Sequence, residues 1–255
     1  MLLGSKDGKI FIHEASGFHT YDKKREVRKS DIFDLASITK VISTTSAIMK
    51  LYDNKLLDLD DPVINYVPEF KGRQKKYFDH KSNITIKDLL THTSGLPPFR
   101  QYYLMKGSID TRLDSIYNTE PVFGLHETMV YSDVGIIILG KIVETISKVK
   151  LDVFVQSNIF DPLGMNNTFY NPPKEKLHRM VPTEIDPRGN LIKGYVHDEN
   201  AYSIGGVAGH AGLFSKTKDL AIFSQMMLNK GLYGWKRLFR SCLLYTSDAA
   251  DDRLR

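Results

Sequence analysis

A serine and a lysine three positions apart are the first residues in this sequence whose types and spacing could do chemistry. Ser37 and Lys40 begin a stretch in which apolar residues recur at helical spacing as far as Tyr52. Because residues i and i+3 share one face of a helix, the Ser37 hydroxyl and the Lys40 amine can form a hydrogen bond. The helix dipole also favours negative charge on a serine oxygen in the first turn. The pair therefore indicates a nucleophilic serine, with a serine that only caps the helix as the alternative.

The same Ser-x-x-Lys spacing occurs twice more, beginning at Ser147 and at Ser215. Ser147 lies near the end of a predicted helix, where the dipole has the wrong sign for an alkoxide. Ser215 precedes another predicted helix, and we expect either Ser215 or Thr217 to cap it. Only Ser37 both opens a long apolar helix and follows a segment that favours a β-strand.

Tyr131 and Asp133 stand just before a second long predicted helix, residues 134–149. A phenol near Ser37 and Lys40 would complete a set of hydroxyl, amine and phenol, in which the amine or the phenol can accept the serine proton. A buried aromatic side chain is the plain alternative for Tyr131. The tyrosine therefore becomes a catalytic candidate only in combination with the serine and the lysine.

Charge and composition exclude several other classes of function. The 255 residues include 35 Lys and Arg against 30 Asp and Glu, a net charge of +5, with no block of five like charges that would indicate nucleic-acid binding. The single cysteine excludes an intramolecular disulfide and a cysteine-cluster zinc site. No apolar run approaches the length of a membrane span, and no secretion signal is visible. His197 beside Asp198 and Glu199 lacks a suitably spaced third ligand, so we expect it to lie in a structural loop rather than in a metal site.

Strand patterns are concentrated at the start of the chain and helical patterns in its middle. Residues 9–15 form a β-rich run after an Asp-Gly turn, which indicates one arm of an antiparallel hairpin. We expect His92 to be a hydrogen-bonded residue at a helix end, and residues 172–200 to be irregular. This order predicts an α+β fold. The apolar spacing predicts helices over residues 37–52, 84–90, 134–149, 153–160 and 219–229.

Several short motifs occur along the chain in an order that carries a family resemblance. They are residues 34–40 (DLASITK), 89–96 (LLTHTSGL), 131–133 (YSD) and 160–165 (FDPLGM). In this order they resemble the serine β-lactamase and penicillin-binding-protein superfamily, of the class C-like type, over about residues 4–241. Two further stretches, 196–201 and 205–214, resemble a narrower bacterial subgroup, some members of which follow a glycoside hydrolase family 3 domain.

The resemblance implies a fold and a mechanism. A β-lactamase/transpeptidase-like fold packs a helical domain against an antiparallel sheet, with the active site in the groove between them. Ser37 would form an acyl-enzyme, Lys40 would be its proton partner, and Tyr131 the base and proton shuttle. The substrates would be acyl groups of peptides, esters or lactams, such as D-Ala peptides of the cell wall, processed without a metal or cofactor at a periplasmic or other extracytoplasmic location. A non-catalytic module of the same fold, which binds peptidoglycan or an attached glycosidase, is the alternative.

Two departures from the family pattern matter. Asp133 stands where the family usually has asparagine, and we expect it to contact substrate as an acceptor only. A carboxylate close to Lys40 favours the ammonium form, so we predict that Tyr131 carries more of the base role. The family's third motif, Lys or His followed by Thr or Ser and then Gly, has no good match, because residues 210–212 (HAG) and 216–218 (KTK) are better explained as structural.

The last residues of the chain differ in character from the rest. Residues 242–251 (CLLYTSDAAD) resemble the translated sequence of a transposase-type sequencing adapter. We therefore expect residues 242–255 to be a non-native tail and residues 1–241 to be a partial domain, with strands over about 1–30 and the helical, active-site region over about 31–241. A sheet that lacks its later strands leaves unpaired edges. We expect the complete protein to be an enzyme and this chain alone to be inactive.

Overall fold

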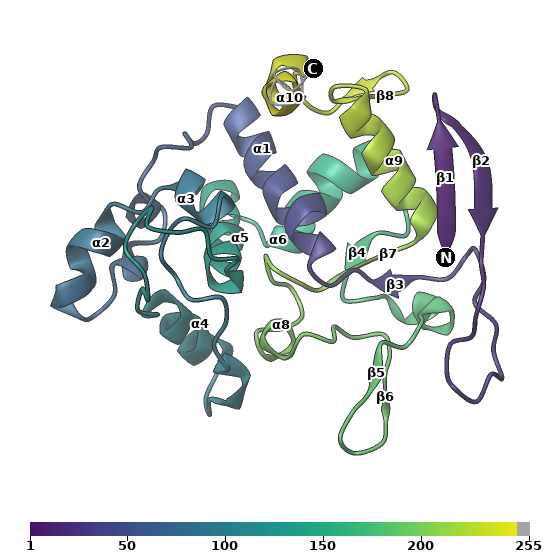
Figure 1. The fold of residues 1–255 in the computed structure, drawn as a ribbon, viewed down its shortest axis with the longest axis horizontal. Coiled ribbons are helices and arrows are strands. Elements are labelled where there is room, and N and C mark those ends of the chain that lie inside the picture. Colours follow the sequence, from purple (N-terminus) through teal and green to yellow (C-terminus); the bar gives the residue numbers. More distant parts are fainter. Residues whose placement is uncertain (249–255) are drawn as a thin grey trace.

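The computed structural model describes residues 1–248, which form helices and several small sheets, with the N-terminal strand hairpin at one edge of the molecule (Figure 1). The strands are β1 (Leu2–Lys6), β2 (Lys9–Glu14), β3 (Phe33–Asp34), β4 (Phe169–Tyr170), β5 (Glu184–Ile185), β6 (Leu191–Ile192), β7 (Leu213–Ser215), β8 (Leu232–Tyr233) and β9 (Lys236–Arg237). The α-helices are α1 (Ser46–Asp53), α2 (Phe78–Ser82), α3 (Ile86–Leu90), α4 (Ile109–Tyr117), α5 (Asp133–Ser147), α6 (Leu151–Val155), α7 (Asp161–Leu163), α8 (Glu199–Ser203), α9 (Thr217–Leu228) and α10 (Ser241–Asp248). Shorter 3-10 and π-helical segments include η1 (Lys40–Thr45), η5 (Tyr102–Leu104), η6 (Gln156–Phe160) and η7 (Lys174–Arg179).

All pairings between these strands are antiparallel. The hairpin β1–β2 turns at Asp7 and Gly8, which both have positive φ angles, as a tight two-residue turn between twisted strands requires. The sheet that matters for the site has the order β3–β7–β4, so the late strand β7 joins two segments from much earlier in the chain. Helices packed with antiparallel sheets confirm the predicted α+β class.

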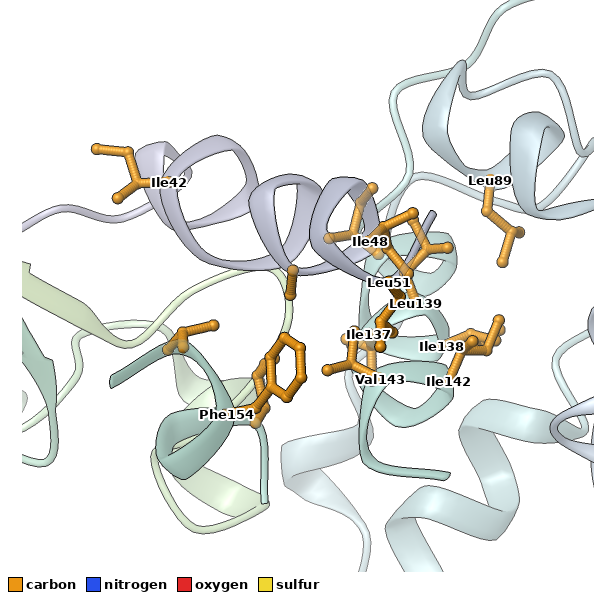
Figure 2. Close-up of a cluster of buried hydrophobic side chains, with 14 of the residues drawn as sticks. Ile42, Ile48, Leu51, Leu89, Ile137, Ile138, Leu139, Ile142, Val143 and Phe154 are labelled. Atoms are coloured by element: carbon orange, nitrogen blue, oxygen red, sulfur yellow. The ribbon is translucent and has the colours of Figure 1, made fainter. Parts of the chain in front are cut away.

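The main core forms where α1, α5 and α6 meet (Figure 2). Ile48 and Leu51 of α1 are buried in the same cluster as Ile137 and Val143 of α5 and Phe154 of α6. Each such side chain stabilises the fold by about 1.5–3 kcal/mol on burial. Since α1 continues the helical segment that starts after Ser37, and α5 begins at Asp133, this core fixes the two site-bearing helices against each other.

A glycine-rich segment, residues 205–212, threads closely past α5. A Cβ atom added to Gly209 would lie 2.2 Å from the carbonyl oxygen of Ile136, and one added to Gly140 would lie 3.2 Å from the Gly209 Cα. Thr44 of η1 donates a hydrogen bond of 2.6 Å to the Gly209 carbonyl oxygen. The missing side chain at Gly209 is therefore what allows this segment to lie between η1 and α5.

Most of the predicted elements are confirmed, with shifted boundaries. The β1–β2 hairpin is present, α5 starts at Asp133, and helical turns run from residue 38 to residue 53. The predicted cap of α9 is wrong: its N-cap residue is Lys216, which makes no capping hydrogen bond through its side chain. Ser215 instead ends strand β7, and its hydroxyl pairs with that of Thr168 at 2.7 Å. Ser215 is therefore the last residue of strand β7 and does not cap helix α9, contrary to the prediction.

The C-terminal tail prediction falls partly on structured residues. Helix α10 spans Ser241–Asp248 and so overlaps the predicted tail, while residues 249–255 lie outside the described part of the chain. The division into residues 1–241 and 242–255 stays a prediction. Within residues 1–248, no helix combines the length and apolar character needed to cross a membrane.

Candidate active site

Ser37 lies where strand β3 turns into the first helix. Asp34, the last residue of β3, accepts a hydrogen bond of 2.8 Å from the backbone N–H of Ala36, and Ala36 adopts a left-handed φ of +45°. Helical turns then run without a break from Ile38 through η1 to the end of α1. Ser37 therefore stands at the N-terminal end of the helix, as predicted, where the dipole favours negative charge on its oxygen.

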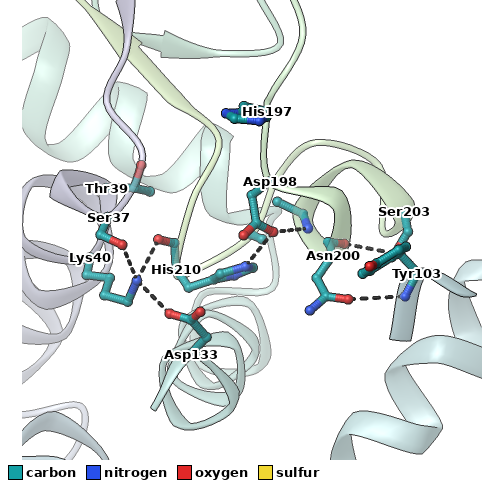
Figure 3. A network of polar contacts seen from close by, with 12 residues as sticks. Ser37, Thr39, Lys40, Tyr103, Asp133, His197, Asp198, Asn200, Ser203 and His210 are labelled. Carbon is teal, nitrogen blue, oxygen red and sulfur yellow. Dashed lines mark hydrogen bonds and ion pairs between the residues drawn. The ribbon is translucent and has the colours of Figure 1, made fainter. Parts of the chain in front are cut away.

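Lys40 is buried, and its ammonium group contacts three acceptors (Figure 3). The Lys40 Nζ atom donates to Ser37 Oγ at 2.8 Å and to the backbone oxygen of His210 at 3.1 Å. It forms an ion pair with Asp133 Oδ1 at 2.7 Å. An ammonium group has three N–H donors and no acceptor. Two of these donors are used in hydrogen bonds, and the ion pair with Asp133 balances the charge, so the arrangement suits a charged Lys40.

Asp133 is placed by the start of α5 and by the loop that follows α3. Ser132 caps α5, because its hydroxyl oxygen accepts a hydrogen bond of 3.3 Å from the N–H of Gly135. The same hydroxyl donates to the Pro97 carbonyl oxygen at 2.7 Å, and the Asp133 N–H donates to the Pro98 carbonyl oxygen at 2.9 Å. These hydrogen bonds fix the backbone at Asp133, and so they fix the position from which its carboxylate reaches Lys40.

Tyr131 contacts Lys40 and His92 through its aromatic ring and not through a hydrogen bond. The Lys40 Nζ atom lies 4.9 Å from the centre of the Tyr131 ring, and the His92 ring packs against it at 4.8 Å between centroids. The Tyr131 side chain is half exposed, and its hydroxyl has no hydrogen-bond partner among residues 1–248. The structure therefore brings Tyr131 beside Lys40, with its hydroxyl free to meet a substrate or a water molecule.

His210 and Asp198 form a second layer of the site, which the sequence analysis did not identify (Figure 3). The buried His210 ring donates from Nε2 to Asp198 Oδ1 at 2.8 Å. Asp198 also caps α8, since it accepts a hydrogen bond of 2.7 Å from the Ala201 N–H. Because the His210 carbonyl oxygen contacts Lys40, the Asp198–His210 pair fixes one of the three acceptors around the ammonium group.

Helix α8 connects this second layer to the helical region around η5. The Asn200 side chain accepts from the Tyr103 N–H at 3.1 Å (Figure 3). It also donates to the Arg100 carbonyl oxygen at 2.8 Å. These bonds join segments about a hundred residues apart in sequence. They connect η5 to helix α8, whose N-cap residue Asp198 binds His210.

The charges of the site act on the pKa of Asp198. Burial by itself raises that pKa, but the hydrogen bond and positive charge of His210, the Ala201 N–H and the charge of Lys40 together hold it below its usual value. Two features of the sequence could have pointed to Asp198 and His210, namely the N-cap position of Asp198 and the density of glycines before His210. Neither signal indicates that a backbone carbonyl, rather than a side chain, contacts Lys40.

Asp133, Asp198 and His210 are also the residues that could hold a metal ion. One oxygen or nitrogen atom from each lies within 4.8 Å of the others. However, the Lys40 ammonium group already neutralises Asp133, and the His210 Nε2 atom is bonded to Asp198. A cation in this position would face the ammonium charge at short range. The cluster therefore fits a hydrogen-bonded network better than a metal centre.

The remaining candidate residues lie outside this network or support it from the backbone. His197 is exposed and its N–H donates to Asp34 Oδ2 at 2.9 Å, so it has the loop role we expected. Ser147, the first residue of the second Ser-x-x-Lys pattern, donates its hydroxyl to the Val143 carbonyl oxygen at the end of α5. His92 follows α3 and accepts a hydrogen bond on its ring, which confirms the prediction of a bonded residue at a helix end.

A serine at a helix N-terminus, a buried lysine three residues later and an acidic residue from a second helix lie together in this site, an arrangement that is compatible with a nucleophilic serine. The family model described as Beta-lactamase matches residues 2–238. The chain belongs to this family.

Curated relatives with similar sequences come from Salmonella. Proteins of Salmonella typhimurium and Salmonella heidelberg are each 36% identical to this chain over 267 residues, which cover 93% of the chain. They are named as D-alanyl-D-alanine carboxypeptidases, an assignment that their own names mark as provisional. The aligned region is 62% of each relative's length.

Solved structures show the same fold at low sequence identity. The octameric penicillin-binding protein homologue from Pyrococcus abyssi superposes with a TM-score of 0.72 at 23% identity, covering 94% of this chain and 53% of that one. A class C β-lactamase from Rhodobacter sphaeroides gives 0.69 at 19% identity, with 91% and 60% covered. FmtA from Staphylococcus aureus gives 0.73 at 19% identity, with 93% and 62% covered. The predicted β-lactamase/penicillin-binding-protein fold is confirmed.

Proposed function

We propose that this chain is the nucleophile-bearing part of a serine acyl-hydrolase, in which Ser37 attacks the acyl carbon of a peptide, ester or lactam. The observation that carries the proposal is the contact of Lys40 Nζ with Ser37 Oγ at 2.8 Å and with Asp133 Oδ1 at 2.7 Å. A serine that only capped its helix would not need a buried ammonium group paired with a carboxylate from another helix.

The contacts around Lys40 suggest how the proton moves. A charged Lys40 cannot accept the Ser37 proton, but it can donate to the Ser37 oxygen and stabilise negative charge there. Tyr131 would accept the proton as the bond between Ser37 Oγ and the acyl carbon forms. It would then return the proton to the leaving group as the bond from the acyl carbon to that group breaks. The nearby Lys40 charge would offset a phenolate on Tyr131 during this step.

Hydrolysis of the acyl-enzyme would repeat the same steps with water. Tyr131 would take a proton from water as its oxygen bonds to the acyl carbon, and Ser37 would recover a proton as its ester bond breaks. Asp133, whose side chain is 22% exposed, would accept a hydrogen bond from an N–H group of the substrate through a lone pair that Lys40 does not use.

Among possible substrates, D-Ala peptides of the cell wall fit best with the names of the Salmonella relatives. This choice rests on those names and on the acceptor at Asp133, and esters and β-lactams remain substrates of the same chemistry. Attachment to a glycoside hydrolase domain also stays part of the proposal for the whole protein.

The test uses the complete reading frame that encodes this chain, called the complete protein below. Its reaction with a fluorescent penicillin and with a short-chain p-nitrophenyl ester is compared with that of two variants. We expect Ser37→Ala to abolish both reactions and Ser147→Ala, which removes the serine of another Ser-x-x-Lys pattern, to leave both intact. A folded complete protein without labelling or turnover would favour the non-catalytic binding module instead.

A further inference from the structure

His92 makes two hydrogen bonds to the segment that carries Tyr131, one on each side of it. Its carbonyl oxygen accepts from the Val130 N–H at 2.9 Å, and its ring Nδ1 atom accepts from the Ser132 N–H at 3.1 Å. His92 lies just after α3 with a left-handed φ of +60°. This uncommon backbone conformation directs both acceptors toward the same short segment.

The bond from Ser132 fixes the protonation state of the His92 ring. A backbone N–H can only donate, so the Nδ1 atom must carry a lone pair and the ring must be neutral with its proton on Nε2. The same ring packs against Tyr131 at 4.8 Å, with the planes tilted by 44°. Because the Tyr131 hydroxyl has no partner within residues 1–248, its orientation depends on His92 on one side and Lys40 on the other.

We propose that His92 is a positioning residue that holds Tyr131 beside Lys40 only while its ring is neutral, so that protonation of His92 releases the segment from Tyr131 to Asp133. A protonated ring would bring an Nδ1 proton against the Ser132 N–H and a positive charge toward Lys40. Both effects are repulsive, and the contact at Tyr131 would be lost. The proposal rests on the proposed role of Tyr131 as the base.

The charged groups that face His92 come from both neighbouring helices. Burial and the positive charge of Lys40 lower the pKa of His92, and the negative charge of Asp133 opposes them. The net direction is below the ordinary value of about 6.5. The neutral ring therefore dominates at neutral pH, and we expect the release of Tyr131 only below pH 6.5.

The first test is independent of activity. In the complete protein with isotope-labelled histidine and backbone amides, nuclear magnetic resonance can follow the His92 ring and the Ser132 amide as the pH falls. We expect the Nε2–H tautomer at neutral pH and a shift of the Ser132 amide with the same midpoint as the ring, below pH 6.5. An Nδ1–H tautomer, or a ring that titrates without moving Ser132, would overturn the proposal even if Ser37 is catalytic.

The second test uses a substitution that keeps the acceptor and removes the titration. His92→Asn places an amide oxygen close to the position of Nδ1, and asparagine tolerates left-handed backbone angles. We expect His92→Ala to slow penicillin labelling about tenfold at pH 7, as loss of one hydrogen bond implies, and His92→Asn to recover most of the rate. The acidic loss of rate should persist in a control, His178→Asn, on the exposed segment η7, and disappear in His92→Asn. An acidic loss that persists in His92→Asn would contradict the proposal.

Discussion

Gly209→Ala tests whether the glycine-rich segment positions the acceptors around Lys40. The added Cβ would lie 2.2 Å from the Ile136 carbonyl oxygen and 3.2 Å from Thr44 Oγ1. The backbone of α5 is held by its own helical hydrogen bonds, so the segment that contains Gly209 must move away. That movement would break the bond from Thr44 to the Gly209 oxygen and the bond from Lys40 to the His210 oxygen.

The expected cost of Gly209→Ala follows from these contacts. The neutral hydrogen bond contributes about 1 kcal/mol and the one from the charged lysine about 2 kcal/mol. Forcing an extra methyl group into a packed region adds about 1 kcal/mol or more. We therefore expect the free energy of unfolding to fall by about 4 kcal/mol, and penicillin labelling of the remaining folded protein to slow, because one acceptor of Lys40 is displaced.

Denaturant unfolding and labelling rates of the complete protein measure both effects. Gly135→Ala in α5 is the matched control: its added Cβ would meet Leu89 at 3.4 Å, an ordinary contact. Because alanine favours helices over glycine by about 1 kcal/mol, this control should be neutral or slightly stabilising. If Gly209→Ala unfolds within about 1 kcal/mol of the unaltered protein and is labelled at the same rate, the reasoning is refuted.

Three further predictions concern other residues of the structure. Tyr131→Phe should slow acylation by about a hundredfold or more while Lys40 stays paired, because it removes the proposed base; a near-normal rate of ester turnover would contradict this. Asp198→Ala should lower the free energy of unfolding by about 2 kcal/mol in denaturant titrations, since it removes the α8 cap and the His210 partner; no change in stability would show that the pair is dispensable. Burial lowers the pKa of Lys81 from 10.5 to about 8, so the unfolded chain binds more protons between these values and stability should rise there by on the order of 3 kcal/mol with increasing pH. Lys81→Met should flatten this rise in thermal unfolding, and a slope that it leaves unchanged would refute the assignment.

The catalytic candidates could be predicted because their signals are local. The i, i+3 spacing of Ser37 and Lys40 places both on one helix face whatever the rest of the fold does. The family resemblance placed Tyr131 and Asp133 near them, and the predicted closeness of Asp133 to Lys40 is confirmed by their ion pair. The role of Tyr131 as the base stays a prediction.

The parts that could not be predicted depend on contacts between distant segments. His210 contributes a backbone oxygen, which leaves no trace in the residue type, and Gly209 is required by a close approach to α5. The expected cap at Ser215 was wrong because β7 pairs with β3 and β4, and propensity for a helix cap does not reveal such pairing. Tertiary packing decided these positions.

The position of a covalent adduct tests the central claim most directly. The complete protein is treated with benzylpenicillin, digested, and its peptides are measured by mass spectrometry. We predict an acyl adduct on the peptide that contains Ser37, its loss in Ser37→Ala and its retention in Ser147→Ala. A folded protein that carries no adduct, or carries it on a residue other than Ser37, would contradict the account.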